Sequence, residues 1–249
     1  MGGDERPPAQ PPEPPGHVAF SRRTRRRFLI WGLISTFLCL ALCAVAAWYP
    51  QVLDRWDQVP RLDPDRWRAT AAWLERPLVW VSFAFGTVAS AIATAMVAGL
   101  LVARKQTRAA AYVVLVMAGT SLVTTLLKQY VGLARPVVAD PIIEYTSSAM
   151  PSGHASNIAA AVTAACVLSA LFLRRRSRRR LVLVVGVLVA VVVGLDRLLL
   201  GVHTLTEVVA GYALGVGVGL LTAYVVDPAP VAPVRRGPGS TVLQPGGHP

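Results

Sequence analysis

Seven ionisable side chains in the second half of the chain lie at or near the ends of long apolar segments: Lys128, Arg135, His154, Asp196, Arg197, His203 and Glu207. An Asp, Lys or Arg at the centre of a membrane span costs roughly 2.5 to 3.5 kcal/mol, so residues of this kind usually serve a function. A single arginine could reach the membrane surface with its long side chain, but that does not account for seven polar groups. Cations bind anions, and histidines transfer protons or act as nucleophiles. We therefore expect a catalytic anion site.

Lys128 and Arg135 are seven residues apart. This is close to two helical turns, which predicts that both cations lie on one helix face about 10 Å apart. Pro136 disfavours helix at Arg135 itself. Arginine offers a planar fork of donors and lysine a point charge, and together they suit a phosphoryl group in a water-filled cleft. Taken alone, the two residues could instead anchor the chain at the membrane surface.

The sequence Pro151-Ser152-Gly153-His154 stands directly before an apolar segment that begins at Ala155. Ser152 is placed as a helix N-cap, so the amides of Gly153 and His154 are expected to be free donors at the positive end of a helix dipole. An oxyanion could approach them closely because glycine has no side chain. The alternatives are an ordinary cap with an interfacial histidine or a serine nucleophile, which is less favoured because no G-x-S-x-G sequence surrounds Ser152.

The third group of polar residues begins with Asp196-Arg197 and continues to His203 and Glu207. His203 and Glu207 are four residues apart at the start of an apolar segment, so the carboxylate can reach the imidazole from the next helical turn. A carboxylate on one ring nitrogen selects the tautomer and leaves the other nitrogen basic, as in catalytic triads. A buried hydrogen-bonded pair that locks two helices together is the alternative.

These residues belong to a chain with the composition of a membrane protein. Its 249 residues are 54% apolar and 15% charged, with a mean hydropathy of +0.51, whereas ordinary globular chains carry about 25% charge. Roughly 20 helical residues cross the hydrocarbon layer of a membrane. We predict an all-α, polytopic membrane protein, a bundle of six transmembrane helices within residues 28–226, and place its spans at 28–49, 78–103, 109–127, 155–173, 181–200 and 205–226.

Short basic loops predict the orientation of this bundle. Five arginines lie within residues 22–27, three basic residues within 104–108 and six arginines within 174–180. Cytoplasmic loops carry such an excess of Lys and Arg, so we expect both termini in the cytoplasm and the polar residues at the outer face of the cell membrane. The same topology accounts for the net charge of +12, and we expect no nucleic acid partner.

Both ends of the chain are expected to be disordered. Residues 1–20 and 227–249 each contain six prolines, and neither can bury enough apolar surface to fold. We assign residues 1–27 to a basic N-terminal tail and residues 227–249 to a C-terminal tail. A signal peptide cleaved after Ala44-Val45-Ala46 is the alternative for the first span, and it would leave five spans in the same orientation.

Three further patterns predict packing. Asp63-Pro64 followed by Trp67 predicts a capped helix that lies on the outer surface. A repeated G-x-x-x-G in the last span predicts close contact between helices of the same chain, at Gly211, Gly215 and Gly219. All the cysteines lie in apolar segments, where we expect them to pack and not to form disulfides: Cys39, Cys43 and Cys166.

The motifs K-x6-R-P, P-S-G-H and R-x5-H-x3-E, in this order and separated by membrane spans, resemble the type 2 phosphatidic acid phosphatase family, whose soluble relatives include vanadium haloperoxidases. The resemblance covers residues 109–226, about half of the chain. It implies a six-helix membrane phosphatase that works without a metal ion or other cofactor. It further implies His203 as the nucleophile, Glu207 as the carboxylate that orients it, His154 as the general acid, and a phosphate site formed by Lys128, Arg135, Ser152, Gly153 and Arg197.

Two residues depart from the family pattern. The third motif usually begins Ser-Arg and here reads Asp196-Arg197, and the residue after His-x3 is usually Asp but here is Glu207. Glutamate keeps the charge but adds a methylene, so the imidazole must sit slightly differently. Asp196 places a negative charge beside a phosphate-binding arginine, where it either weakens anion affinity or pairs with Arg197.

A site at the outer interface, flanked by membrane helices, is reached by a lipid headgroup whose tails remain among the membrane lipids. We expect hydrolysis of a lipid phosphate through a phosphohistidine. Phosphatidate, phosphatidylglycerophosphate and polyprenyl diphosphate all fit, and the last is favoured because the architecture looks bacterial. The alternatives are a transporter that uses the intramembrane charges as a relay and a non-catalytic descendant of the family. The sequence leaves the oligomeric state open.

Overall fold

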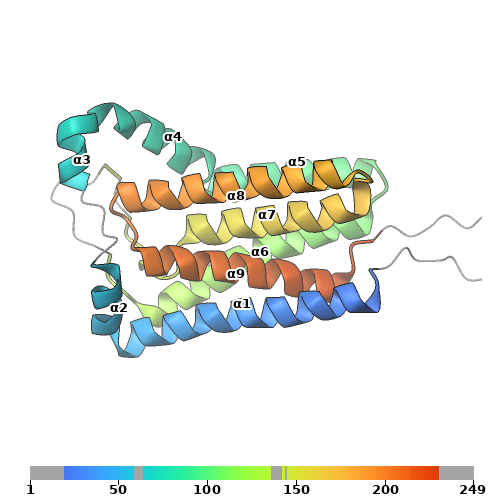
Figure 1. Ribbon diagram of the computed structural model, residues 1–249, viewed down its shortest axis with the longest axis horizontal. Coiled ribbons are helices and arrows are strands. Elements are labelled where there is room, and N and C mark those ends of the chain that lie inside the picture. Colours follow the sequence, from blue (N-terminus) through green and yellow to red (C-terminus); the bar gives the residue numbers. More distant parts are fainter. Residues whose placement is uncertain (1–19, 59–63, 136–141, 144, 230–249) are drawn as a thin grey trace, which may run out of the picture.

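The computed structural model describes residues 20–58, 64–135, 142–143 and 145–229. Within these residues the elements are helices, and no strand occurs among them (Figure 1). Five helices are long and apolar enough to cross a membrane: α1 (Arg22–Trp48), α6 (Thr107–Val131), α7 (Gly153–Phe172), α8 (Arg176–Leu199) and α9 (Leu205–Val226). The predicted all-α membrane fold is therefore confirmed, and the chain is a multi-pass membrane protein.

The second predicted span is a helix pair instead of one straight helix. α4 (Glu75–Ala84) and α5 (Thr87–Ala103) are separated at Phe85 and Gly86, and the segment 67–84 together with α5 has the length and hydropathy of one crossing bent by 48°. Gly86 is the N-cap of α5 and has extended backbone, with ψ of 172°. Counted as one crossing, this bent pair brings the candidate spans within the described residues from five to six, the number that hydropathy predicts.

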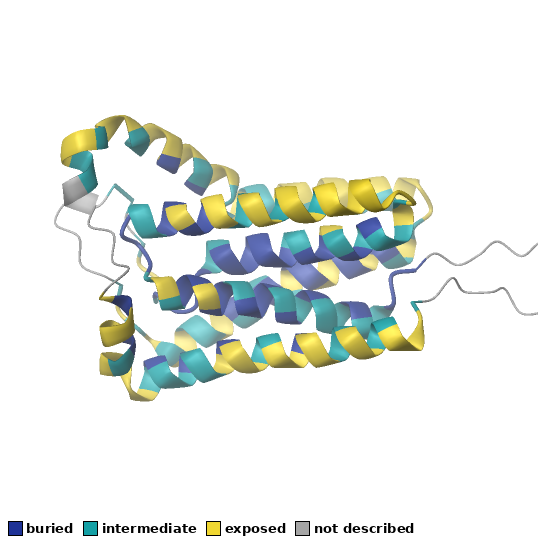
Figure 2. Ribbon diagram, viewed as in Figure 1, coloured by how far each residue is buried: buried dark blue, intermediate teal, exposed yellow. Residues whose placement is uncertain are grey.

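Helices α7 and α9 form the centre of the bundle (Figure 2). About half of the apolar window of each is buried, 56% in α7 and 50% in α9, against 17% in α1 and 22% in α8. Their axes approach closely because α9 presents glycines: a Cβ on Gly211 would lie 2.6 Å from the carbonyl oxygen of Ser152, and one on Gly215 would lie 2.6 Å from the amide of Ala160. The predicted packing of the G-x-x-x-G repeat is confirmed.

Short helices cover the end of the bundle at which α9 begins: α2 (Pro50–Asp57), α3 (Pro64–Ala71) and the 3-10 turn η1 (Ala72–Leu74). The predicted surface helix corresponds to α3, while its expected cap, Asp63, lies outside the described residues. Trp67 packs against the protein, since its indole Nε1 donates a hydrogen bond to the carbonyl of Leu199 over 2.8 Å and its ring contacts the cluster of Leu78, Leu200 and Val202.

The described structure extends a few residues into both predicted tails. Residues 22–27 belong to α1, whose first turn is capped by the hydroxyl of Ser21, which accepts a hydrogen bond from the amide of Thr24. At the other end Asp227, Pro228 and Ala229 are buried. The rest of the tail prediction falls on residues 1–19 and 230–249, outside the described part of the chain.

At the end of the bundle opposite to α2 and α3, basic side chains donate hydrogen bonds to the last carbonyls of α9. Arg25 donates to the carbonyl of Tyr224 over 2.9 Å, and Arg108 donates to the carbonyl of Val226 over 2.8 Å. The last carbonyls of a helix have no partner within the helix, so both arginines satisfy groups that burial would otherwise leave unpaired. The three cysteines are free thiols within their helices, as predicted.

Candidate active site

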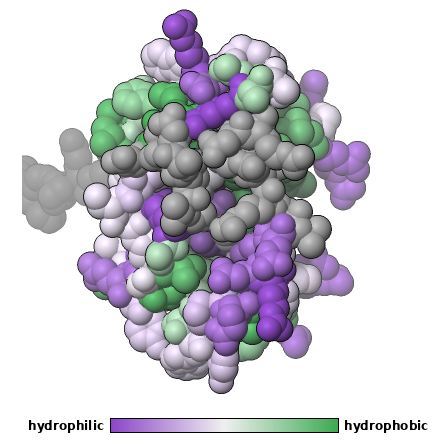
Figure 3. Space-filling view, turned by 90° about the vertical axis from the view of Figure 1, so that its left-hand side faces the viewer, coloured by the Kyte–Doolittle hydropathy of each residue, from purple (hydrophilic) through white to green (hydrophobic). Residues whose placement is uncertain are grey.

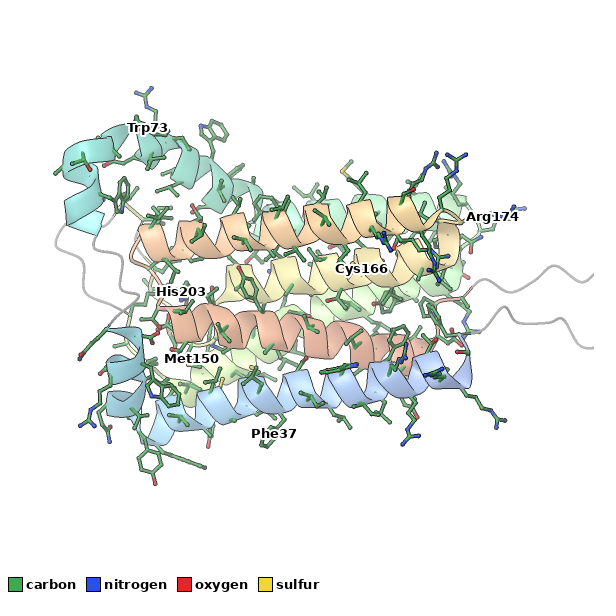
Figure 4. All side chains as sticks on the ribbon, in the orientation of Figure 1. Phe37, Trp73, Met150, Cys166, Arg174 and His203 are labelled. Atoms are coloured by element: carbon green, nitrogen blue, oxygen red, sulfur yellow. The ribbon has the colours of Figure 1, made fainter. Side chains whose placement is uncertain are left out.

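The polar residues singled out from the sequence gather at one end of the bundle. Figure 4 shows His203 at this end and Arg174, in the arginine-rich turn between α7 and α8, at the opposite end. Figure 3 looks along the helices from the His203 end, where hydrophilic and apolar residues both reach the surface. The two kinds of basic residue, those of the site and those of the loops, are thus separated by the length of the bundle.

His203 and Glu207 form a buried pair at the start of α9. His203 lies in the turn between α8 and α9, and its Nδ1 is 2.6 Å from Oε2 of Glu207 in the first turn of α9. A carboxylate accepts a hydrogen bond, so Nδ1 carries the proton. The same Oε2 also accepts a hydrogen bond from the amide of Thr204 over 3.2 Å, which completes a capping box with the Thr204 side chain. The longer side chain of glutamate thus holds the imidazole and caps the helix.

Arg135 meets the other ring nitrogen of His203. Its Nη1 lies 3.3 Å from Nε2 of His203 and donates to the carbonyl of Val202 over 2.8 Å. A guanidinium can only donate, so Nε2 is the acceptor and the imidazole is neutral. Burial first, and then the positive charges of Arg135, Lys128 and Arg197, hold the pKa of His203 well below its usual range. The histidine therefore presents a lone pair on Nε2.

Lys128 and Arg135 do not share a helix face, contrary to the prediction from their spacing. α6 ends at Val131, and Gly132 adopts left-handed backbone with φ of 61°, which glycine accommodates without strain. Lys128 stays on the helix and donates to the carbonyl of Ser148. The chain after Gly132 carries Arg135 to Ser147, whose carbonyl accepts from the arginine Nε over 2.9 Å. Lys128 thus comes from a helix and Arg135 from a loop, and they donate hydrogen bonds to the adjacent residues Ser148 and Ser147.

Ser152 lies at the start of α7, as predicted, but its side chain does not make the predicted capping contact. Ser152 is the N-cap, yet its hydroxyl makes no capping bond; Oγ is buried and has no hydrogen-bond partner among the described residues. Its backbone amide donates to the carbonyl of Glu207 over 3.1 Å, which ties the start of α7 to the start of α9. At Gly153 the nearest atom to an added Cβ would be Cγ2 of Thr124, 3.9 Å away.

A cavity of about 560 Å³ opens beside the first turn of α7. Lys128 and Gly153 both line it, together with hydroxyl and amide side chains from α6 and α7 such as Thr124 and Asn157. A lysine at one wall and a helix N-terminus at another are groups that bind an anion. The cavity therefore offers space and charge for an anion, whereas His154, His203 and the two arginines are not among the residues that line it.

Arg197 is fully buried at the end of α8 and surrounded by acceptors. Its Nε donates to Oδ2 of Asp196 over 2.9 Å, its Nη1 to the hydroxyl of Tyr145 over 3.0 Å, and its Nη2 to the hydroxyl of Ser82. Of the two outcomes expected for the unusual Asp196, the structure has the ion pair. Tyr145 links the two arginines, since the guanidinium of Arg135 lies over its ring, 4.6 Å from the centroid.

His154 lies in the first turn of α7, where its Nε2 is 3.1 Å from the carbonyl oxygen of Ser82 in α4. Its ring also stands edge-on to Tyr145, with centroids 6.4 Å apart. Tyr145 and Ser82 thereby connect His154 to both arginines. Contacts and the shared cavity join all the site residues predicted from the sequence into one group: Lys128, Arg135, Ser152, Gly153, His154, Arg197, His203 and Glu207.

Several residues of this group are not predicted from the sequence. Ser82 is a hydroxyl inside an apolar span, and Tyr145 and Ser147 lie in a loop, where no spacing distinguishes them. Asp57 of α2 is buried at the start of α9, where its carboxylate accepts from the amide of Thr206 over 3.0 Å and from the Thr206 hydroxyl over 2.5 Å. Two features of the sequence could have indicated such residues: the hydroxyl of Ser82 within a predicted span and the carboxylate of Asp57 in a short amphipathic helix.

Nowhere in the described residues do three or more carboxylate, histidine or cysteine side chains lie close enough together to hold a metal ion. The charge of the group comes instead from one lysine and two arginines, with Glu207 and Asp196 each paired to a neighbour. Lysine and arginine side chains are groups that can bind an anion.

Comparison with known proteins places this group within a recognised family pattern. The PAP2 superfamily pattern matches residues 109–229. Over 108 residues the chain is 34% identical to phosphatidylglycerophosphatase B of Bacillus subtilis (strain 168), a match of 41% of this chain and 50% of that protein. The chain therefore spans about half the length of this curated relative.

The fold is also similar to a crystal structure of a transmembrane PAP2-type phosphatidylglycerolphosphate phosphatase from Bacillus subtilis. The TM-score is 0.61, with 22% sequence identity, and the match covers 80% of this chain and 94% of that one. The likeness in fold thus extends beyond residues 109–229 to most of the bundle.

Proposed function

The chain belongs to the PAP2 superfamily through residues 109–229, and we propose that it is a membrane phosphatase that removes a phosphoryl group from a lipid headgroup. One observation carries this proposal. His203 is buried between Glu207, 2.6 Å from Nδ1, and Arg135, 3.3 Å from Nε2, so its neutral imidazole is oriented with a lone pair toward a phosphate-binding cation. A nucleophile held by a carboxylate on its far side is the arrangement that nucleophilic catalysis requires.

In the first step His203 attacks phosphorus. The anionic headgroup draws the guanidinium of Arg135 from Nε2 to a phosphate oxygen, and Nε2 then forms a bond to phosphorus. The bond between phosphorus and the lipid oxygen breaks, its electron pair stays on that oxygen, and His154 supplies a proton to it. Lys128, Arg197 and the amide of Gly153 neutralise the remaining oxygens, and positioning of this kind supplies most of the catalysis in phosphoryl transfer.

In the second step water hydrolyses the phosphohistidine. His154, which is neutral after giving up this proton, takes a proton from the water as its oxygen bonds to phosphorus, and the phosphorus–nitrogen bond returns its electron pair to Nε2 of His203. Inorganic phosphate leaves. The hydroxyl of Ser152, buried and without a hydrogen-bond partner among the described residues, is available to donate a hydrogen bond to a phosphate oxygen in both steps. The three cations supply the charge that this chemistry needs, and we propose that the enzyme works without a metal ion.

The substrate is a phosphate headgroup whose tails stay in the membrane. The names of the two similar proteins favour phosphatidylglycerophosphate as the first compound to test. Phosphatidate and polyprenyl diphosphate offer the same terminal phosphate and remain alternatives. The arginine-rich turn at Arg174 lies at the opposite end of the bundle from His203. Because such loops stay in the cytoplasm, we place both termini inside and the site at the outer face.

Release of phosphate by the purified full-length protein in detergent tests the proposal. We expect turnover of at least one of the three lipids, unaffected by EDTA, and none by His203→Ala at an unchanged melting temperature. Activity retained in His203→Ala would show that the nucleophile is misassigned, and activity lost with EDTA and restored by Mg²⁺ would contradict metal independence. If the wild-type protein releases phosphate from none of the three lipids, the proposed phosphatase activity is refuted.

A further inference from the structure

The second membrane span is broken beside the site, although this span lies outside the matched residues 109–229. We propose that the break at Phe85 and Gly86 provides the hydrogen-bond acceptor that orients the general acid His154, so that Ser82 is a positioning residue of the active site. This inference rests on the proposed phosphatase function, and it concerns a part of the chain in which the sequence motifs place no site residue.

Helix geometry explains why the Ser82 carbonyl is available. In a continuous α-helix the carbonyl of residue 82 would accept from the amide of residue 86. Here the amide of Gly86 donates to Phe83 over 3.2 Å, and the amide of Phe85 donates to Val81 over 3.0 Å. The carbonyl of Ser82 is thereby released from the helix, and Nε2 of His154 lies 3.1 Å from it, across 72 residues of sequence.

This contact determines the tautomer of His154. A carbonyl oxygen can only accept, so Nε2 of His154 carries a proton and Nδ1 is left to exchange one with the leaving oxygen and then with water. When His154 becomes an imidazolium, its bond to Ser82 becomes charge-assisted and stronger. His203 has the opposite tautomer, because Glu207 accepts at its Nδ1. The two histidines are therefore oriented by different acceptors for different roles.

Ser82 also reaches the phosphate-binding arginine through its side chain. Its hydroxyl accepts from Nη2 of Arg197 and lies 3.4 Å from Oδ2 of Asp196, to which it donates. One residue thus holds the acid with its carbonyl and the arginine with its hydroxyl. These two functions can be separated, because substitution of the side chain leaves the carbonyl in place.

A substitution of Gly86 tests the role of the Ser82 carbonyl. A Cβ at this position would lie 3.1 Å from the carbonyl oxygen of Ser82, 3.3 Å from that of Phe83 and 3.9 Å from Nε2 of His154. Its φ of −70° is open to any residue, so Gly86→Ala crowds the carbonyl without straining the backbone. Alanine also favours a continuous helix more than glycine does. Gly99 in α5 is the matched control, since an added Cβ there meets nothing within 4 Å.

The experiment compares two leaving groups in the purified full-length protein. A lipid alkoxide leaves slowly without a general acid, whereas the phenolate of 4-nitrophenyl phosphate leaves without one. Since general acid catalysis is worth roughly 10² to 10⁴-fold, we expect Gly86→Ala to lower kcat/KM for the lipid phosphate about 100-fold and to change that for the aryl phosphate by about threefold at most. Gly99→Ala should leave both values unchanged.

Ser82→Ala separates the second function. It keeps the carbonyl, so the ratio of the two kcat/KM values should stay as in the wild type, while the inhibition constant of inorganic phosphate rises because Arg197 loses a partner. Equal losses on both substrates in Gly86→Ala, or none, would overturn the inference. So would a changed ratio in Ser82→Ala.

A measurement on the wild-type protein keeps the inference testable if Gly86→Ala does not fold. Nitrogen-15 NMR of histidine-labelled protein, with His154→Ala and His203→Ala for assignment, should show His154 protonated at Nε2 and His203 at Nδ1. The same tautomer in both rings would overturn the inference. A wild-type protein that hydrolyses neither phosphate would refute the proposed function, whereas an active wild type with Gly86→Ala equal to Gly99→Ala would refute only the role of the break.

Discussion

Nη1 of Arg135 lies 3.3 Å from Nε2 of His203, the ring nitrogen opposite the one that Glu207 holds. The cation that we propose to bind phosphate thus covers the lone pair that we propose to attack phosphorus. An anion that attracts the guanidinium would uncover this lone pair at the moment of binding. The contact also brings a positive charge to the imidazole, which disfavours its protonation.

The charge of Arg135 should set the acid limit of activity. Burial and nearby cations hold the pKa of His203 well below its usual range. The wild-type imidazole should therefore stay neutral, and the enzyme active, at pH values below the ordinary histidine pKa of about 6.5. Arg135→Gln removes one of these charges, so the pKa of His203 rises and the acid limb of kcat/KM moves to higher pH, with a lower maximum. Profiles with 4-nitrophenyl phosphate measure the shift.

Arg104→Gln is the control for Arg135→Gln, since it removes an equal charge from the exposed turn after α5. It should leave the profile unchanged. An acid limb that stays in place in Arg135→Gln would show that the arginine does not act on His203.

Glu207→Gln should inactivate the enzyme without unfolding it. An amide can donate to Nδ1 and so stabilise the wrong tautomer of His203, an effect that costs about 10⁴-fold in a serine protease triad. We expect a loss of about 10² to 10⁴-fold in kcat, measured with the lipid substrate, at a melting temperature close to that of the wild type. A loss below tenfold would indicate that the carboxylate only caps α9.

Glu207→Asp tests why this chain has the longer residue. Aspartate, shorter by a methylene, cannot reach both Nδ1 of His203 and the amide of Thr204 from the same position. We expect partial activity together with a loss of about 1 kcal/mol in the free energy of unfolding, the usual cost of a lost helix cap. Unchanged stability in thermal unfolding would contradict the capping role.

Gly153→Ala should separate binding from folding. The nearest atom to the added Cβ lies 3.9 Å away, an ordinary contact, so the melting temperature should not fall. The Cβ would stand in the cavity beside Lys128 and obstruct the approach of phosphate to the first turn of α7. We expect kcat/KM to fall about tenfold or more and the inhibition constant of inorganic phosphate to rise. Wild-type kinetics would place the phosphate elsewhere.

Gly211→Ala should have the opposite effect, a loss of stability. Its Cβ would lie 2.6 Å from the carbonyl oxygen of Ser152 and 2.9 Å from Cβ of Ala155, so α7 and α9 must move apart. Overpacking of this kind costs about 1 to 3 kcal/mol, which thermal unfolding in detergent would detect. Gly119→Ala in α6 is the matched control, because its Cβ meets Cγ1 of Val218 at 3.7 Å. Equal melting temperatures for both variants would contradict the close packing.

Asp196→Ser restores the residue that the family usually has and leaves Arg197 without its ionic partner. Removing one member of a buried ion pair costs about 3 to 5 kcal/mol, so the melting temperature should fall. Inorganic phosphate can then pair with the arginine, and by linkage it should raise the melting temperature of the variant more than that of the wild type. An equal rise in both proteins would show that phosphate does not reach Arg197.

The sequence by itself determined the membrane bundle and the charged residues and histidines of the site, but not Ser82, Tyr145, Ser147 or Asp57. A membrane span is a local property of about 20 consecutive residues, so hydropathy was sufficient to locate the crossings. Charges near these spans were conspicuous because burying them is costly. The contact between His203 and Glu207 was also predictable from their spacing of four residues, with His203 in the turn before α9 and Glu207 in the first turn of that helix.

Only the tertiary structure decided how these residues meet. The turn at Gly132 carries Arg135 away from the helix face of Lys128, and His154 reaches Ser82 across 72 residues, as Arg197 does across 115. Contacts of this kind depend on how helices pack and where one of them breaks, and neither leaves a fixed spacing in the chain. The same reason explains why α4, which has no motif, contributes to the site.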